Sequence, residues 1–329
     1  MNISMWGKAL RIIPRVSKKE WQELDPIAKW LIATRSAVFV MTAFSALVGG
    51  LLAAADDNFD VVKFSLCLIG LVLAHATNNL VNDYTDSVRG VDKDNYFRTM
   101  YGPQTLEHGL WTKAKLLTVI AGTGLAALAC GVALIFMSGT DVLWVTLAGA
   151  FFVLFYTWPL KFIGLGEPAV LIVWGPLMVG GTYLAITGSW SWTVAAIGAI
   201  YALGPTTVLF GKHTDKLIED KKKNIHTLPV IIGEKNARHS VIAMLVLQPV
   251  IVTAFVFAGL LEYPMLVVLL GIPSIITAVK VFLKVRPTVK PADFPDEGWP
   301  TYLASHAFKC NRITGSLFVI GLIVSVFVN

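Results

Sequence analysis

The feature that most constrains this chain is a series of long stretches that contain no Asp, Glu, Lys or Arg. A helix needs about 20 residues to cross the roughly 30 Å hydrocarbon core of a bilayer. The longest charge-free stretch, 168–211, is interrupted by Gly188-Ser189-Trp190-Ser191 and divides into 168–187 and 192–211. The sequence therefore predicts nine membrane-spanning helices, at 36–55, 64–82, 116–140, 142–160, 168–187, 192–211, 239–261, 263–279 and 313–329.

Composition excludes a soluble protein, and the sequence pattern excludes a membrane β-barrel. Hydrophobic residues make up 55% of the chain, charged residues only 15%, and the mean hydropathy is +0.67. An ordinary soluble domain has about 25% charged residues, and barrel strands would alternate in polarity over about ten residues. We therefore expect an all-α integral membrane protein. It forms a single domain over 1–329, with a cytoplasmic N-terminal segment at 1–34 and a nine-helix membrane domain at 35–329.

The basic residues orient the chain in the membrane. Of the 27 Lys and Arg residues, all but Lys63 fall in the N-terminal segment or in the loops near 82–115, 157–167, 211–238 and 280–312. Cytoplasmic loops carry an excess of Lys and Arg. We therefore predict a multi-pass protein of the cell membrane, with its N-terminus in the cytoplasm and its C-terminus outside. This distribution explains the net charge of +6 without a nucleic-acid partner, and no obligate protein partner is expected.

Two acidic clusters lie on the cytoplasmic side. In the first, Asn79, Asp83 and Asp86 stand at i, i+4 and i+7, so they share one helix face, which His75 continues one turn deeper. The second follows the sixth predicted helix and places Asp215 and Glu219 at i, i+4. Each cluster alone is compatible with a hydrated helix end. However, polar groups within a membrane span are costly and usually functional, and clustered carboxylates repel unless a cation lies between them.

The chemistry that suits both clusters is the binding of a diphosphate through Mg²⁺. Magnesium is held in proteins by one or two carboxylates together with water and substrate phosphate oxygens, and it stabilises the charge that develops on a leaving group. Nearby basic residues could donate to the phosphate oxygens or could act as topology anchors: Arg35, Arg89, Arg98 and Lys161. A cation-coupled transporter is the alternative from another class, since acids in membranes also mark ion pathways.

Aromatic residues gather near the same face. Tyr156, Trp158, Phe162 and Trp174 are typical of an interfacial belt, but their ring faces could also shelter an allylic cation. His213 and His226 do not have the spacing of a zinc pair, and the chain has no Walker loop, GxSxG elbow or HExxH motif.

The run Asn79-Leu-Val-Asn82-Asp83-Tyr-Thr-Asp86 followed by Gly90-Val-Asp92 resembles the first acidic motif of the UbiA superfamily of intramembrane prenyltransferases. It is most similar to the 1,4-dihydroxy-2-naphthoate polyprenyltransferase branch of menaquinone biosynthesis, as are the segments 102–110, 156–167 and 227–238. The resemblance implies a UbiA-like helical bundle with a cytoplasm-facing cavity. It also implies Mg²⁺-dependent transfer of a polyprenyl chain from an allylic diphosphate to an aromatic acceptor, either this naphthoate, 4-hydroxybenzoate or another quinone or lipid precursor.

The resemblance also implies roles for individual residues. Metal ligands would be Asn79, Asp83, Asp86, Asp215, Glu219 and Asp220, and substrate-binding residues would be Arg35, Asn79, Arg89, Tyr156, Lys161 and Lys216. The chain departs from the family pattern at the second motif, because Lys216 falls where the first aspartate is usual, while Asp220 matches the second. We therefore predict that Asp215 and Asp220 are the essential pair there, beside Asp83 and Asp86, and that Glu219 is secondary. An ammonium cannot ligate a metal, so Lys216 is expected to donate to a diphosphate oxygen.

Overall fold

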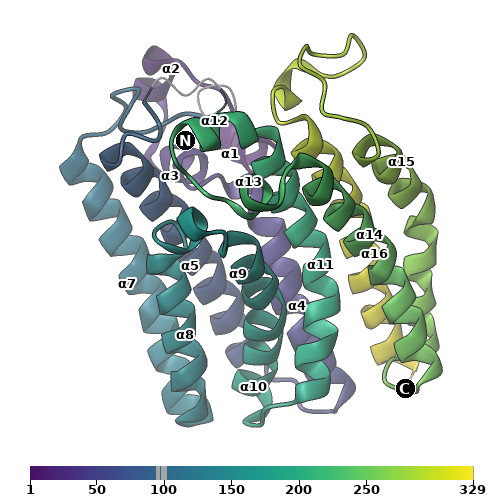
Figure 1. Ribbon diagram of the computed structural model, residues 1–329. Coiled ribbons are helices and arrows are strands. Elements are labelled where there is room, and N and C mark those ends of the chain that lie inside the picture. The colour runs from purple at the N-terminus through teal and green to yellow at the C-terminus, as the bar shows by residue number, and fades with distance from the viewer. Residues whose placement is uncertain (94–96, 98–101, 329) are drawn as a thin grey trace.

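Long helices run side by side through the whole molecule (Figure 1). The computed structural model describes residues 1–93, 97 and 102–328, and these form helices and loops without a strand. Eight helical segments are long and apolar enough to cross a membrane. They are Ser36–Ala55 (which includes α4, Phe39–Ala55), α5 (Val61–Val88), α7 (Lys113–Ser138), Gly166–Thr187, α11 (Trp192–Asp215), α14 (Glu234–Phe257), Tyr263–Phe282 (which includes α15, Ile272–Phe282) and α16 (Tyr302–Val328). The prediction of an all-helical, multi-pass membrane protein is confirmed.

The helix at the fourth predicted span is shorter than expected. The sequence predicted a span over 142–160, whereas α8 covers Asp141–Phe155, 15 residues and therefore about 22 Å. The helix ends early because Pro159 lacks a backbone N–H and disfavours a helical residue before it. A 3₁₀ turn at Leu160–Ile163 follows, and Gly164 ends it in a left-handed conformation with φ 79°.

Polar side chains fix where the long helices begin. The Asp60 carboxylate accepts hydrogen bonds from the first N–H groups of α5, at 2.9 and 3.0 Å. Thr112 and Ser191 cap α7 and α11 in the same way. These caps satisfy backbone donors that have no partner within the helix.

The N-terminal segment packs against one end of the bundle. It contains the short helices α1 (Ile3–Ala9), α2 (Lys18–Glu23) and α3 (Pro26–Ala33). Asp25 caps α3 and also accepts a hydrogen bond from Trp6 Nε1 at 3.1 Å, which ties α1 to α3. Trp21 and Ile32 join a buried cluster with Leu80 of α5 and Leu116 of α7. This packing fixes the position of Arg35, just after α3.

The helix α11 lies at the centre of the bundle. Its apolar residues form a core with α4, α14, α16 and the segment Tyr263–Gly271. The span Gly166–Thr187 consists of α9 (Gly166–Ile172), a π-helical stretch Val173–Gly180 and α10 (Gly181–Thr187). Its backbone breaks at Gly175, where a Cβ atom would lie 2.8 Å from the Gly198 carbonyl oxygen of α11. Glycine at 175 therefore lets the two backbones touch.

The short helices α12 (Leu217–Lys222) and α13 (Leu228–Ile232) lie at the same end of the bundle as the N-terminus, whereas the C-terminus lies at the opposite end (Figure 1). We refer to the end that holds α12 and the N-terminus as the inner end.

Candidate active site

A cavity of about 730 Å³ lies between α5, α7, α8, the α9–α10 span and α11. On α5 its lining extends from Leu66 to Asp86, which is about 30 Å of helix. Apolar and small residues line most of it. Polar residues gather at the inner end: Arg35, Asn79, Asn82, Asp86, Lys161, Lys212, His213 and Lys216. The cavity thus offers a charged head region and a long apolar region.

The first acidic motif is held by a buried arginine. Arg35 has a left-handed backbone, with φ 56°, a conformation that is uncommon for a residue other than glycine and that clusters at functional sites. Its guanidinium forms a buried ion pair with Asp83 and lies 3.5 Å from Asn79 Oδ1. Asn79 Nδ2 donates to the Thr34 carbonyl at 2.7 Å. The three residues form one connected group beside the cavity.

A lysine holds the third member of the motif. Lys161 Nζ lies 2.7 and 2.8 Å from the two carboxylate oxygens of Asp86, and both side chains line the cavity. Lys161 comes from the 3₁₀ turn after α8, where Pro159 ends the helical path. The fold therefore brings together Lys161 and Asp86, two predicted site residues that lie 75 positions apart in the sequence.

Arg89 lies outside this group. Its guanidinium stacks 4.3 Å above the Trp158 ring, and neither residue is among those that line the cavity. Arg98 lies outside the described residues.

The second acidic cluster is divided by the structure. The Asp215 carboxylate accepts hydrogen bonds from Arg286 Nε at 2.9 Å and from the backbone N–H groups of Leu303 and Ala304, at 3.1 and 3.0 Å. These donors turn it toward the first turn of α16, and neither Asp215 nor Asp220 is among the residues that line the cavity. The physical reason is that α11 ends at Asp215 and that its last turns pack on α16, where a Cβ atom added to Gly211 would lie 2.9 Å from the Ala304 nitrogen.

Lys216 separates α11 from α12 and faces the cavity. Its Nζ lies 3.2 Å from Asp220 Oδ1, and Asp220 is buried. Asp220 Oδ2 is buried without a hydrogen-bond partner among the described residues. Glu219 does not line the cavity and is half-buried. The side chains that the second cluster presents to the cavity are thus those of Lys212, His213 and Lys216.

Glu167 and His213 form a buried pair that was not predicted from the sequence. His213 Nδ1 lies 2.7 Å from Glu167 Oε1, and both residues are almost fully buried, at 2% and 1% exposure. Glu167 Oε2 is buried and has no partner in the described part of the chain. An acid inside an apolar segment almost always has a partner. The position of Glu167 at the start of the span was therefore the available signal, but a partner 46 residues away could not be identified.

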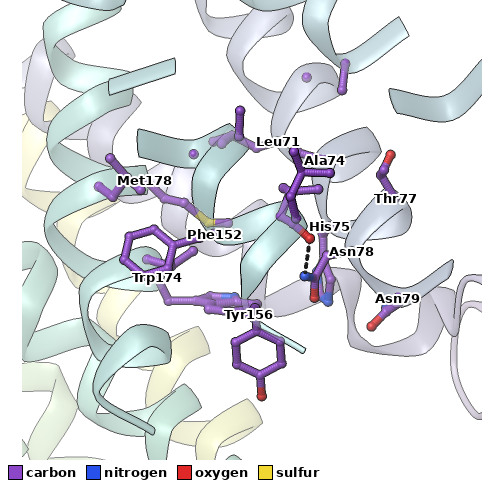
Figure 2. Close-up of a pocket in the computed structure, with 18 of the residues that line it drawn as sticks. Leu71, Ala74, His75, Thr77, Asn78, Asn79, Phe152, Tyr156, Trp174 and Met178 are labelled. Carbon is purple, nitrogen blue, oxygen red and sulfur yellow. Dashed lines mark hydrogen bonds between the residues drawn. The ribbon is translucent and has the colours of Figure 1, made fainter. Parts of the chain in front are cut away.

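An aromatic wall lies next to the charged end. Phe152, Tyr156 and Trp174 line the cavity together with Met178 (Figure 2). The Trp174 ring makes an edge contact with His75, whose Nδ1 lies 2.7 Å from Thr42 Oγ1. Trp174 Nε1 is buried and bonds no described residue.

The residues at the inner end fit a Mg²⁺ ion that is completed by a substrate. The described residues contain no group of three or more His, Cys, Asp and Glu side chains gathered for a metal. Asn79 and Asp86 line the cavity and Asp83 is buried against Arg35, so oxygen donors of the preferred type are present. Magnesium usually takes only one or two carboxylates and obtains its other ligands from water and phosphate.

Comparisons with known proteins identify the family of the chain. A UbiA prenyltransferase domain-containing protein 1 homolog of Drosophila melanogaster is 28% identical over 236 residues, which cover 67% of this chain and 62% of that protein. The chain therefore spans less than two thirds of that relative. The 1,4-dihydroxy-2-naphthoate octaprenyltransferase of Escherichia coli is 27% identical over 223 residues, 66% of this chain and 72% of that protein.

A solved structure has the same fold. A UbiA homolog from Archaeoglobus fulgidus bound to DMAPP and Mg²⁺ matches with a TM-score of 0.59 at 16% identity, over 92% of this chain and all of that one. Residues 42–294 match the UbiA prenyltransferase family as a whole. This match covers more than half of the sequence, and the chain therefore belongs to the UbiA prenyltransferase family.

Proposed function

We propose that this enzyme transfers a polyprenyl chain from its allylic diphosphate to an aromatic ring carbon, with 1,4-dihydroxy-2-naphthoate as the acceptor. The observation that carries the proposal is the division of one cavity, whose lining on α5 is about 30 Å long, into a charged inner end and an apolar region. A molecule with a diphosphate at one end of a long hydrocarbon chain has the same division. Two proteins to which the chain is similar support this substrate class. They are the 1,4-dihydroxy-2-naphthoate octaprenyltransferase of Escherichia coli and the Archaeoglobus homolog bound to DMAPP.

The inner end binds the diphosphate. Asn79, Asp83 and Asp86 would hold Mg²⁺, which when bound neutralises the charge that develops on the leaving diphosphate. Arg35 and Lys161 form ion pairs with Asp83 and Asp86. Both would donate to phosphate oxygens with Mg²⁺ held by those carboxylates. Arg89, which stacks on Trp158, would guide the diphosphate from outside the cavity.

The aromatic wall suits the transferred group and the acceptor. When the allylic C–O bond breaks, its electron pair leaves with the diphosphate, and the ring faces of Tyr156 and Trp174 stabilise the allylic cation. The electron-rich ring carbon that bears the carboxylate then supplies the pair for the new C–C bond. The ring becomes aromatic again when this carboxylate leaves as CO₂ and the electron pair of its C–C bond returns to the ring. Trp174 Nε1 is an available donor for an oxygen of the acceptor.

The orientation in the cell membrane is part of the proposal. The termini lie at opposite ends of the bundle (Figure 1), which supports an odd number of crossings, with α8 as the ninth span. The N-terminus and the charged end of the cavity would face the cytoplasm, where Lys and Arg are concentrated.

The test uses purified protein with Mg²⁺, allylic diphosphates of several lengths, and 1,4-dihydroxy-2-naphthoate or 4-hydroxybenzoate. Mass spectrometry of the extracted lipids should show the prenylated, decarboxylated naphthalene product. A product formed only from 4-hydroxybenzoate would reject the acceptor and keep the reaction class. Diphosphate consumed without any prenylated ring would reject the proposed reaction.

A further inference from the structure

In the described part of the chain, most charged side chains that line the inner end of the cavity are positive. Arg35, Lys161, Lys212 and Lys216 all line it. Within the described ranges, Asp86 is the one carboxylate among the lining residues. A cavity that bound two metal ions through two acidic clusters would be expected to present carboxylates from both sides.

The second cluster presents its lysines and withdraws its acids. Asp215 is directed at α16 and Arg286. Asp220 contacts the cavity-lining Lys216 at 3.2 Å, and is therefore an ion-pair partner of that lysine. Lys212 and Lys216 stand at i, i+4 at the end of α11, so their side chains share a face. A helix C-terminus also stabilises positive side chains.

We propose that one divalent cation, at Asn79, Asp83 and Asp86, binds the diphosphate together with the ammonium groups of Lys212 and Lys216, which replace a second metal ion. This inference rests on the proposed function, because it concerns the same diphosphate. Two ammonium groups carry the same formal charge as one Mg²⁺, and that of Lys216 is also paired with Asp220. They offer donors and no lone pair for a metal, and their charge disfavours a second cation nearby.

The direct test counts metal ions. Purified protein is saturated with a geranyl S-thiolodiphosphate analogue, which resists cleavage, and titrated with Mn²⁺ while electron paramagnetic resonance reports free Mn²⁺. We expect one tightly bound Mn²⁺ per chain. Two bound ions would overturn the inference while supporting the proposed function. An analogue that does not bind at any Mn²⁺ concentration would overturn the proposed function itself, and the inference with it.

Two variants sharpen the count. Lys216→Asp places a carboxylate at the cavity and should bind a second Mn²⁺ in the presence of the analogue. Lys221→Asp is the matched control, because it makes the same charge change on the exposed side of α12 and should still bind one. A second ion in both variants, or in neither, would contradict the assignment of position 216.

A milder variant keeps the test decisive if Lys216→Asp does not fold. Lys212→Gln should weaken binding of the analogue on the order of 10-fold, the value of one hydrogen bond to a charged group. The number of bound Mn²⁺ ions should stay at one. Unchanged analogue affinity in Lys212→Gln would overturn the inference.

Discussion

The length of the prenyl chain that the enzyme accepts should depend on Gly149 of α8. Gly149 lines the cavity, and a Cβ atom added there would meet no atom within 4 Å, so a larger side chain has room to extend into the cavity. Tyr156, whose carbonyl oxygen accepts from the Lys161 N–H at 2.9 Å, marks the level of the charged end. Seven residues separate the two positions, which is about 10 Å along the helix.

These distances set the expected effect of Gly149→Leu. Four carbon–carbon bonds in a zigzag make an isoprene unit about 5 Å long. The 10 Å between the charged end and residue 149 therefore hold about two units, whereas the α5 lining outside the charged end, from Leu66 to Asn78 and about 18 Å long, holds about three to four. Gly149→Leu should retain activity with geranyl diphosphate and lose most activity with chains of four or more units.

The assay measures kcat/KM for a series of diphosphates from two to eight isoprene units. Gly122→Leu is the matched control: it makes the same substitution in a membrane helix, α7, at an exposed glycine that is not among the cavity-lining residues and where an added Cβ again meets no atom. An unchanged length profile in Gly149→Leu, or the same shift in both variants, would refute the placement of the chain in the apolar region.

Three further predictions follow from the contacts described above. Asp83→Asn preserves the shape of the side chain but removes an ionised metal ligand. We expect turnover to fall on the order of 100-fold or more while size-exclusion chromatography shows folded protein; near-normal turnover at limiting Mg²⁺ would contradict this role. Asp215→Asn leaves the half-buried Arg286 without its charged partner and should lower the free energy of unfolding by about 2 kcal/mol, the value of a hydrogen bond between charged groups, without changing the Mg²⁺ concentration for half-maximal activity. Thermal unfolding in detergent checks the first part, and a raised Mg²⁺ requirement at unchanged stability would restore Asp215 as a metal ligand. Ser189→Cys, in a background without native cysteines, should react with a membrane-impermeant thiol reagent only from outside the cell, because residue 189 is exposed at the end opposite the inner end; labelling only from the cytoplasm would reverse the topology.

The features that the sequence predicted are those that depend on a single helix. Charge-free length located the spans because the bilayer excludes charge from any helix that crosses it. The periodicity of the α-helix correctly placed Asn79, Asp83 and Asp86 on one side of α5, since residues three and four apart are neighbours on any helix. Helix ends were less accurate: α16 begins at Tyr302, whereas the charge-free stretch begins at 313. A charged residue near the end of a helix shortens the charge-free stretch, so the stretch does not reach the true end of the helix.

Helix periodicity and charge-free length could not predict contacts between distant segments. Asp215 shares an acidic run with Asp220, yet its partner Arg286 lies 71 positions along the chain. The spacing of acids on α11 could not show that the first turn of α16 would offer two free N–H groups to Asp215. In the same way, the pairing of Glu167 with His213 depends on how α9 packs against α11.

The close approach of Gly175 to Gly198 has a mechanical consequence for the cavity. Because the two backbones touch there, and 78% of the apolar span of α11 is buried, the wall that α9–α10 and α11 form is rigid. The opposite wall is different, since only 11% of the apolar span of α7 is buried and the rest is at least partly exposed, either to the cavity or to the outside of the bundle. A bulky hydrocarbon should therefore be accommodated by displacement of α7 and α8 against lipid. We expect the thickness and lateral pressure of the surrounding bilayer to set the energy of that displacement.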